Sequence, residues 1–300
     1  MIKSAEYLVT FSSILGSRAG ISKFAIGLTI VAIGTSLPEL FTAIFGLYSS
    51  NGSSFVFGTV IGSNIVNTLF IFGLLLIFSK NFKSKIKKID IFFLLGATLL
   101  LTLIIVKSNL NIFDSLILLA LFATYIYITI KKSKKEMFEE EIKGAKDKIF
   151  AKKSNYLLSI FLILSIAGLN IAAKGVIYSI ENIGLILKIP LEMLTLTTVA
   201  FATSLPEAIV TYAVAKKKEF DIIIGDIIGS NISNILLIIG VSGLIKNLIF
   251  ETSLYIPSIF ILIIATLIFY FLINKKNVSK IHGIVFLALY VLYIAYTFTP

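Results

Sequence analysis

The sequence has no cysteine and only one histidine among its 300 residues. The absence of cysteine excludes disulfide bonds, thiolate metal sites and cysteine nucleophiles. The single histidine, His282, excludes haem ligation by a histidine pair and clustered histidine zinc sites. Its position just before the last apolar run is typical of a residue at the membrane interface. Acidic residues are also scarce, with 16 of them against 27 lysine and arginine residues.

Apolar residues are abundant: they make up 57% of the chain, and the mean hydropathy is +0.99. Long apolar runs cover 91–106, 112–130, 156–173 and 258–273. Each run approaches the roughly 20 residues that cross a bilayer core as a helix. A membrane β-barrel would instead show segments of about 10 residues that alternate apolar and polar side chains. The sequence therefore predicts an all-α polytopic membrane protein.

Ten apolar segments lie near residues 1–16, 22–47, 56–78, 89–106, 112–130, 156–180, 190–214, 222–245, 253–273 and 281–298. When lysine and arginine are counted in alternate loops, one set of loops holds 22 and the other holds three, Lys107, Lys188 and Lys246. Positive residues concentrate in cytoplasmic loops. We therefore expect the first set to be cytoplasmic and both termini to lie outside the cell membrane. The net charge of +11 then reflects orientation and contact with anionic lipid, not nucleic-acid binding.

The only long charged stretch is 131–155, which separates a first half, 1–130, from a second half, 156–300. We interpret this stretch as a partly helical cytoplasmic linker. Its run of three glutamates, 139–141, fits a solvated charged surface better than a regulatory ion site.

The two halves repeat. "AIGTSLPELFT" (Ala32–Thr42) aligns with "AFATSLPEAIV" (Ala200–Val210) at an offset of 168. "GTVIGSNIVNTLFIFG" (Gly58–Gly73) aligns with "GDIIGSNISNILLIIG" (Gly225–Gly240) at an offset of 167, with 10 of 16 residues identical. The first Pro-Glu segment is followed by "SSNGSS" and the second by "KKKEFD", so the charge rule places these ends on opposite sides. Five spans in each half imply the same, which predicts an inverted repeat, as in many secondary transporters.

The alignment leaves the first helix short. Residue 1 corresponds to residue 169, but the sixth segment already begins near Tyr156, so about a dozen residues lack a counterpart. We expect a truncated first helix and a native start that lies upstream.

Two glutamates, Glu39 and Glu207, lie well inside apolar segments. A charged residue at mid-membrane costs at least about 2.5–3.5 kcal/mol on insertion scales and indicates a functional site. Inverted symmetry would bring the two carboxylates together, where they repel unless one holds a proton or a cation lies between them. No lysine or arginine of the matched segments is placed to neutralise them. The pattern predicts a cation site.

Oxygen ligands accompany both glutamates. Pro38 and Pro206 interrupt their helices and free the carbonyls of Gly34 and Ala202. The hydroxyl and amide side chains on the matching helical faces are Thr35, Ser36, Ser63 and Asn67 in the first half, and Thr203, Ser204, Ser230 and Asn234 in the second. Oxygen donors without nitrogen or sulfur suit Ca²⁺, Mg²⁺ or Na⁺. Any one of them alone would more often make an interhelical hydrogen bond, but the doubled motif favours an ion site.

These motifs, "GTSLPE" and "ATSLPE" with "GSNIVN" and "GSNISN", resemble the two α-repeats of the cation/Ca²⁺ exchanger superfamily, in particular prokaryotic Na⁺/Ca²⁺ exchangers. The resemblance covers nearly the whole chain. It implies ten helices, with helices 2, 3, 7 and 8 around the ion sites and helices 1 and 6 as the gate.

The resemblance also implies a ligand set. A Ca²⁺ site would use the carboxylates of Glu39 and Glu207 with the carbonyls of Thr35 and Thr203. Flanking Na⁺ sites would use the Ala32 carbonyl with Ser36 and Ser63, and the Ala200 carbonyl with Ser204 and Ser230. Asn67 and Asn234 would complete the centre.

Two features depart from the family pattern. Asn234 stands where K⁺-dependent exchangers carry aspartate, and Asn67 and Asn234 stand where cation/H⁺ exchangers place a carboxylate, which favours Na⁺ coupling. Asp226 stands opposite Thr59, on the same helical stripe as Ser230 and Asn234 and about two turns to the cytoplasmic side of Asn234. We hypothesise that Asp226 attracts cations into an inward-facing vestibule. The alternative is an acid at a helix start near the membrane edge.

The predicted function is exchange of Na⁺ for Ca²⁺ by alternating access, with no cofactor and no obligate protein partner. Ca²⁺/H⁺ or Na⁺/Mg²⁺ exchange on the same scaffold stays the alternative. A membrane enzyme would need a Ser/His, paired-aspartate or zinc centre, which the sequence does not offer. A cation channel would usually need filter residues contributed by several subunits, whereas this chain carries its symmetry internally.

Overall fold

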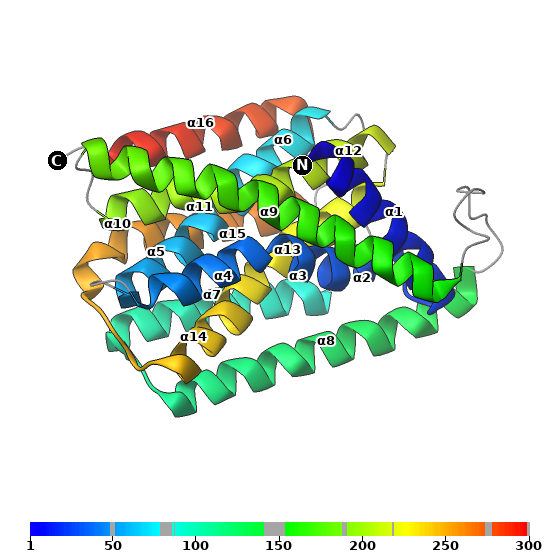
Figure 1. Cartoon of the computed structure of the whole chain (residues 1–300), viewed down its shortest axis with the longest axis horizontal. Coiled ribbons are helices and arrows are strands. Elements are labelled where there is room, and N and C mark those ends of the chain that lie inside the picture. Colours follow the sequence, from blue (N-terminus) through cyan, green and yellow to red (C-terminus); the bar gives the residue numbers. More distant parts are fainter. Residues whose placement is uncertain are drawn as a thin grey trace.

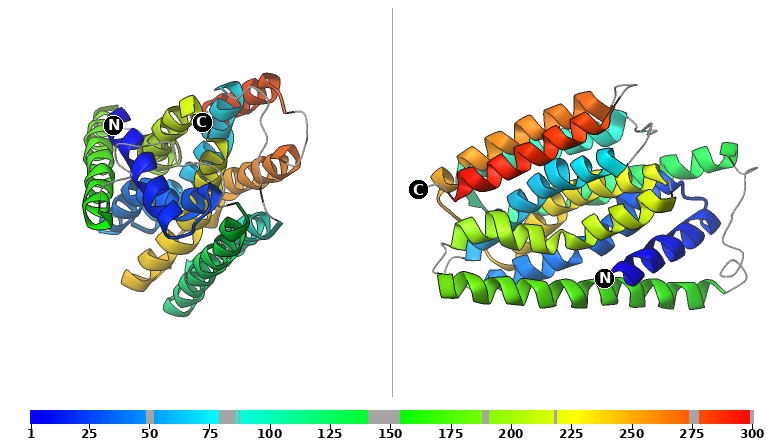
Figure 2. Two further views of the ribbon diagram at one scale, coloured as in Figure 1. Left: turned by 90° about the vertical axis from the view of Figure 1, so that its right-hand side faces the viewer. Right: turned by 90° about the horizontal axis from the view of Figure 1, so that it is seen from above.

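The computed structural model describes residues 1–48, 52–78, 86, 88–140, 154–187, 191–217, 219–273 and 278–298. They form an almost entirely helical bundle, in which most helices run roughly along one common axis (Figure 1, Figure 2). The helices of the first half are α1 (Ile2–Arg18), α2 (Lys23–Ile26), α3 (Ala32–Thr35), α4 (Leu37–Gly46), α5 (Gly52–Ile65), α6 (Phe72–Phe78), α7 (Lys88–Lys107) and α8 (Ile112–Glu140). Those of the second half are α9 (Asn155–Leu187), α10 (Leu191–Leu194), α11 (Ala200–Thr203), α12 (Leu205–Lys217), α13 (Phe220–Ser233), α14 (Ile239–Ile245), α15 (Ile256–Ile273) and α16 (Lys280–Thr297).

The expected linker is described only in part. Its first residues continue α8 as helix up to Glu140, in agreement with a partly helical linker. Residues 141–153 lie outside the described residues, as do 79–85 and 274–277, which hold many of the lysines behind the expected topology.

The described helices include eight that are long and apolar enough to cross a membrane, or nine if the bent pair Thr195–Thr203 and Leu205–Ala215 is one span. The chain is therefore a multi-pass membrane protein. The expected tenth span is α1, which has 17 residues and is about 26 Å long at 1.5 Å per residue. That is short of a hydrocarbon core of about 30 Å. α9, which lies beside α1, has 33 residues. The expectation of a short first helix agrees with this.

Four π-helical segments occur at matched positions of the two halves. They are η1 (Gly27–Val31), η2 (Val66–Ile71), η3 (Thr195–Val199) and η4 (Asn234–Ile238). Segments η1 and η3 come immediately before α3 and α11, and η2 and η4 continue α5 and α13. Wider π turns inside α-helices are rare and are frequently found at functional sites. Both copies of each sequence motif therefore adopt the same unusual local structure.

The helices of the two halves also contact each other in matched pairs. Helix α13 packs against η1 and α3 of the first half, and α5 packs against η3 and α11 of the second. In the same way α14 packs against α8, and α6 against α16. Two further pairs, α1 with α9 and α7 with α15, each join equivalent helices, and α1 lies beside α9 (Figure 2). The segments that carry the motifs thus lie at the centre, each packed against the opposite half.

Glycines permit the closest of these contacts. A Cβ atom at Gly62 of α5 would overlap the backbone carbonyl of Leu196, and a Cβ atom at Gly229 of α13 would overlap that of Leu28. Small residues allow helix backbones to approach closely in membrane proteins. Gly62 and Gly229 are at equivalent positions, so both central helix pairs depend on the same close contact between a glycine and the opposite backbone.

The contacts between loops fall into two groups. Two-residue strands β1 (Asn109–Leu110) and β2 (Leu248–Ile249) pair antiparallel, and the Ile249 N–H donates to the Ser53 hydroxyl at 3.2 Å. In the second group of contacts, the Arg18 side chain donates to Asn155, and the Ser22 N–H donates to the Ser133 hydroxyl at 2.6 Å. The first group joins only loops that the charge rule assigns to the outer side, and the second joins only segments that it assigns to the cytoplasmic side. The described contacts agree with that grouping.

We expect Gly229→Ala to destabilise the protein, because the added methyl group must push α13 away from η1. Overpacking of this kind typically costs about 1–3 kcal/mol. The control is Gly96→Ala in α7, where an added Cβ meets no atom within 4 Å and alanine is the better helix former by about 1 kcal/mol. Thermal unfolding of both variants in detergent measures the difference. Equal midpoints would show that the close approach is not required.

Candidate functional site

Both Pro-Glu motifs interrupt a helix in the same way. The helix stops after Thr35 and after Thr203, and restarts at Leu37 and Leu205. The intervening residues Ser36 (φ −81°, ψ 5°) and Ser204 (φ −83°, ψ 6°) have nearly identical non-helical backbones. Each proline occupies the second position of the new helix, where its missing N–H is tolerated.

These breaks place each glutamate in the first turn of a new helix. The positive end of the helix dipole favours a carboxylate there. Upstream of the breaks, the Ala32 carbonyl accepts from the Ser36 N–H at 3.0 Å, and the Ala200 carbonyl accepts from the Ser204 N–H at 3.1 Å. The carbonyl of Gly34, expected to be freed by Pro38, accepts at 3.4 Å from the side-chain amide of Asn170 on α9.

All the residues expected to bind ions are buried. None of these side chains is more than 4% exposed in the structure: Ala32, Thr35, Ser36, Glu39, Ser63, Asn67, Ala200, Thr203, Ser204, Glu207, Ser230 and Asn234. Burying an ionised carboxylate is costly unless a partner compensates it. The surroundings of Glu39 and Glu207 therefore decide what the site can do.

Each glutamate accepts a hydrogen bond from the opposite half of the chain. The Ser36 hydroxyl donates to Glu207 Oε1 at 3.3 Å, and the Ser204 hydroxyl donates to Glu39 Oε1 at 3.0 Å. The two carboxylates also interact electrostatically with each other. The two motifs, 168 residues apart, therefore form one site at the centre of the bundle.

The serines of the second motif are grouped differently from what the resemblance implied. The Ser230 hydroxyl points to Glu207 Oε1 at 3.5 Å, so Ser230 lies with Ser36 and not with Ser204. The hydroxyl of Ser63 lies 3.2 Å from that of Thr203, so Ser63 is not grouped with Ser36. The physical reason is that α13 packs against the first half, and α5 against the second. The expected groupings Ala32/Ser36/Ser63 and Ala200/Ser204/Ser230 are corrected accordingly.

Asparagines connect the second motifs. The Asn64 amide donates to the Asn231 carbonyl at 3.2 Å, and the Asn231 amide donates to Thr68 at 3.1 Å. The Asn234 amide donates to Asn64 Oδ1 at 3.0 Å, whereas neither amide atom of Asn67 has a hydrogen-bond partner. The sequence interpretation missed Asn64 and Asn231, although both belong to the repeated Gly-Ser-Asn motif, and that repetition was the available signal.

Asp226 does not lie in an open vestibule. Its side chain is fully buried, and the Thr35 hydroxyl donates to its Oδ1 at 3.2 Å. It acts electrostatically on Glu207. In this structure α13 packs along η1 and α3 and carries Asp226 against Thr35. The centre therefore holds three carboxylates. The hypothesis that Asp226 attracts cations into an inward-facing vestibule stays a prediction.

No base balances these charges. The buried polar side chains in the described part of the chain include no lysine, arginine or histidine. One oxygen of each acid, Glu39 Oε2, Glu207 Oε2 and Asp226 Oδ2, is buried without a hydrogen-bond partner. Buried polar atoms are almost always paired, so these oxygens are available as ligands for cations.

The ligands of such cations are mixed. Among the described residues, no three Asp, Glu, His or Cys side chains are placed to share a single metal ion. A bound ion must therefore take hydroxyl, amide or backbone oxygens in addition to carboxylates. Na⁺ and Ca²⁺ are hard cations that accept such oxygen sets.

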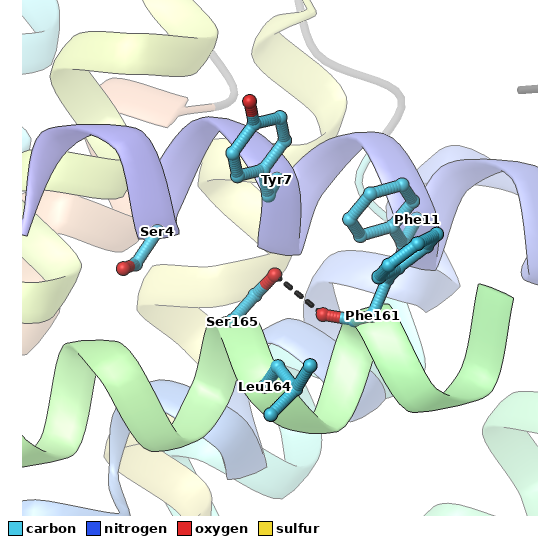
Figure 3. A pocket seen from close by; sticks show the side chains of 6 residues that line it. All are labelled: Ser4, Tyr7, Phe11, Phe161, Leu164 and Ser165. Carbon is cyan, nitrogen blue, oxygen red and sulfur yellow. Dashed lines mark hydrogen bonds between the residues drawn. The ribbon is translucent and has the colours of Figure 1, made fainter. Parts of the chain in front are cut away.

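A surface cavity lies elsewhere. It has a volume of about 340 Å³ between α1 and α9 (Figure 3). It is lined by Ser4, Tyr7, Phe11, Phe161, Leu164 and Ser165. The Ser165 hydroxyl donates a hydrogen bond to the Phe161 carbonyl at 2.6 Å. This cavity has no acidic lining residue and is not the carboxylate centre.

Comparison with known proteins agrees with this geometry. A family model described as sodium/calcium exchanger protein matches residues 1–131 and 157–299. The chain is 30% identical over 296 residues to an uncharacterized membrane protein of Methanocaldococcus jannaschii, covering 97% of this chain and 92% of that protein. It is 29% identical to the sodium/calcium exchanger MaX1 of Methanosarcina acetivorans, covering 99% and 95% of the two chains.

A solved structure has a similar fold. The sodium-calcium exchanger NCX_Mj, soaked with Na⁺ and Ca²⁺, superimposes with a TM-score of 0.76 at 29% identity, covering 98% of this chain and 93% of that one. A family match over nearly the whole chain and this fold, with a buried centre of carboxylates and no base, lead to one conclusion. The chain belongs to the sodium/calcium exchanger protein family, whose members are transporters.

Proposed function

We propose that this protein exchanges Na⁺ for Ca²⁺ across the cell membrane by alternating access. The observation that carries the proposal is the reciprocal pair of hydrogen bonds, in which Ser36 contacts Glu207 and Ser204 contacts Glu39. It shows that one acid from each half reaches a shared, buried centre. The names of MaX1 and NCX_Mj support Na⁺ and Ca²⁺ as the transported ions.

In this proposal Glu39 and Glu207 bind Ca²⁺ together, with the carbonyls of Thr35 and Thr203. Na⁺ binds beside each glutamate on the serine hydroxyls, with Ser36 and Ser230 on one side. On the other side Na⁺ binds on the hydroxyl of Ser204, which contacts Glu39, and on that of Ser63, which lies against the Thr203 hydroxyl. Both ions need the same carboxylates, so binding of one opposes binding of the other. This competition is what couples the two fluxes.

Alternating access requires that the centre open to one side at a time. The matched contacts of the halves support two repeats related by an inverted two-fold axis, an arrangement that makes the inward- and outward-facing states structurally equivalent. Helices α1 and α9 pack mainly on each other and on the broken helices. They are the proposed moving pair against a rigid core of motif-bearing helices.

Transport in liposomes tests the proposal. We expect the purified protein to drive Ca²⁺ uptake when Na⁺ is trapped inside, and not when only a pH gradient is imposed. The measurement is ⁴⁵Ca²⁺ accumulation, with protein-free liposomes as the control. Uptake driven by the pH gradient would establish Ca²⁺/H⁺ exchange instead, and Na⁺-driven Mg²⁺ flux without Ca²⁺ flux would establish Na⁺/Mg²⁺ exchange.

Neutralising either glutamate removes half of the charge proposed to hold Ca²⁺. We expect Glu39→Gln and Glu207→Gln each to weaken Ca²⁺ binding by about tenfold or more, which corresponds to about 1.4 kcal/mol. Glu251→Gln, the same substitution at an exposed residue, serves as the matched control. Equilibrium binding of ⁴⁵Ca²⁺ to purified protein measures the effect. Wild-type affinity in either centre variant would contradict the assignment.

The proposed topology places the 131–155 linker in the cytoplasm and both termini outside. The absence of native cysteine makes single-cysteine labelling unambiguous. We expect Asn109→Cys, in an exposed loop, to react with an impermeant maleimide in intact cells. Lys131→Cys should react only after the membrane is opened. The reverse pattern would invert the proposed orientation.

A further inference from the structure

Asp226 breaks the match between the two halves of the site. Its equivalent in the first half is Thr59, a neutral side chain. The Thr35 hydroxyl donates to Asp226, whereas the equivalent Thr203 lies against Ser63. Asp226 interacts electrostatically with both glutamates, so the second half contributes two carboxylates to the centre and the first half contributes one.

This asymmetry changes the charge balance. Glu39 and Glu207 together offset one Ca²⁺, so a Ca²⁺-loaded centre still contains one uncompensated negative charge. No buried base in the described residues can balance it. An isolated charge removed from water costs several kcal/mol even after the protein relaxes. A further positive charge is required when Ca²⁺ is bound.

The surroundings of Asp226 suit a bound cation better than a proton. A proton on Asp226 Oδ1 can be donated to the Thr35 oxygen, but it leaves the buried Oδ2 without a partner, whereas a cation can satisfy both oxygens. Asp226 Oδ2 has no hydrogen-bond partner, and Oδ1 already accepts from Thr35. The neighbouring groups supply oxygen. The Thr35 hydroxyl can donate instead to the carbonyl of Val31 or Ala32, at 3.1 and 3.2 Å, and then turn its lone pairs to a cation shared with Asp226.

A separate position for this cation is consistent with the geometry. No three acidic side chains among the described residues are placed to bind one ion together. Asp226 therefore does not complete a three-carboxylate Ca²⁺ site with both glutamates. A single carboxylate with hydroxyl and carbonyl oxygens offers too little charge for a second divalent ion, but it suits an alkali cation.

We propose that Asp226, with Thr35 and the adjoining face of Glu207, forms an alkali-cation subsite that stays filled while the two glutamates hold Ca²⁺. The inference rests on the proposed function, because it takes Glu39 and Glu207 as the Ca²⁺ ligands. Its consequence is that one alkali cation binds with Ca²⁺ and does not compete with it.

The test is retention of ²²Na⁺ by the purified full chain at saturating Ca²⁺. We expect about one Na⁺ per chain in the wild type and none in Asp226→Asn, a substitution of almost unchanged shape. Asp221→Asn, in the first turn of the same helix, is the matched control and should retain Na⁺ as the wild type does. Loss of the retained ²²Na⁺ on adding K⁺ would show that the same subsite accepts K⁺.

Other outcomes overturn the proposal. No Na⁺ retained by the Ca²⁺-saturated wild type, or equal retention in Asp226→Asn, would show that Asp226 holds no alkali cation beside Ca²⁺. Loss of ⁴⁵Ca²⁺ binding in Asp226→Asn would place this acid in the Ca²⁺ site itself. A wild type that binds no Ca²⁺ would refute the proposed function separately. In that case, the Na⁺ capacity of Ca²⁺-free protein, expected to be one lower in Asp226→Asn, still tests the subsite.

Discussion

The structure depends on one constraint: three carboxylates lie in the interior of a membrane protein, and none of the described residues places a buried base beside them. Such a centre is stable only if cations accompany the acids or if protons neutralise them. Hydroxyl groups from opposite halves donate to Glu39 and Glu207, which lowers the cost of burying these acids but does not cancel their charge. The remaining unpartnered carboxylate oxygens are then available to ions. The proposed coupling of the two ion fluxes rests on this, because one set of acids cannot serve both ions fully at once.

The rest of the fold holds this centre together. The breaks at Ser36 and Ser204 turn each glutamate into the first turn of a helix, while the preceding π turns alter the register of the residues that lead into the break. Gly62 and Gly229 let each central helix approach the opposite half at backbone distance. Because the contacts are exchanged between halves, neither half contains a complete site. This makes the site sensitive to any relative movement of the halves, which is the property that the proposed alternating access would use.

The centre is nevertheless not symmetric. Asn67 has an amide without partners, whereas the amide of Asn234 is engaged by Asn64. Asp226 faces Thr35, and its counterpart Thr59 is neutral. Two halves with the same backbone thus present different charges to the ions. Duplicated transporters can acquire distinct ion positions in this way, since a single substitution on a repeated scaffold alters one side and leaves the other unchanged.

The sequence by itself determined the helical membrane class, the repeated motifs and the two acids that lie at the centre. These follow from local composition, because a long apolar run must form a helix in lipid and a buried glutamate there is too costly to occur without a role. Only the tertiary structure decided which serine meets which glutamate and that Asp226 is buried against Thr35. Helical spacing tells which residues of one helix share a face. It does not tell which other helix that face meets. Here that depends on the packing of α5 and α13 against the opposite halves, between segments at least 130 residues apart.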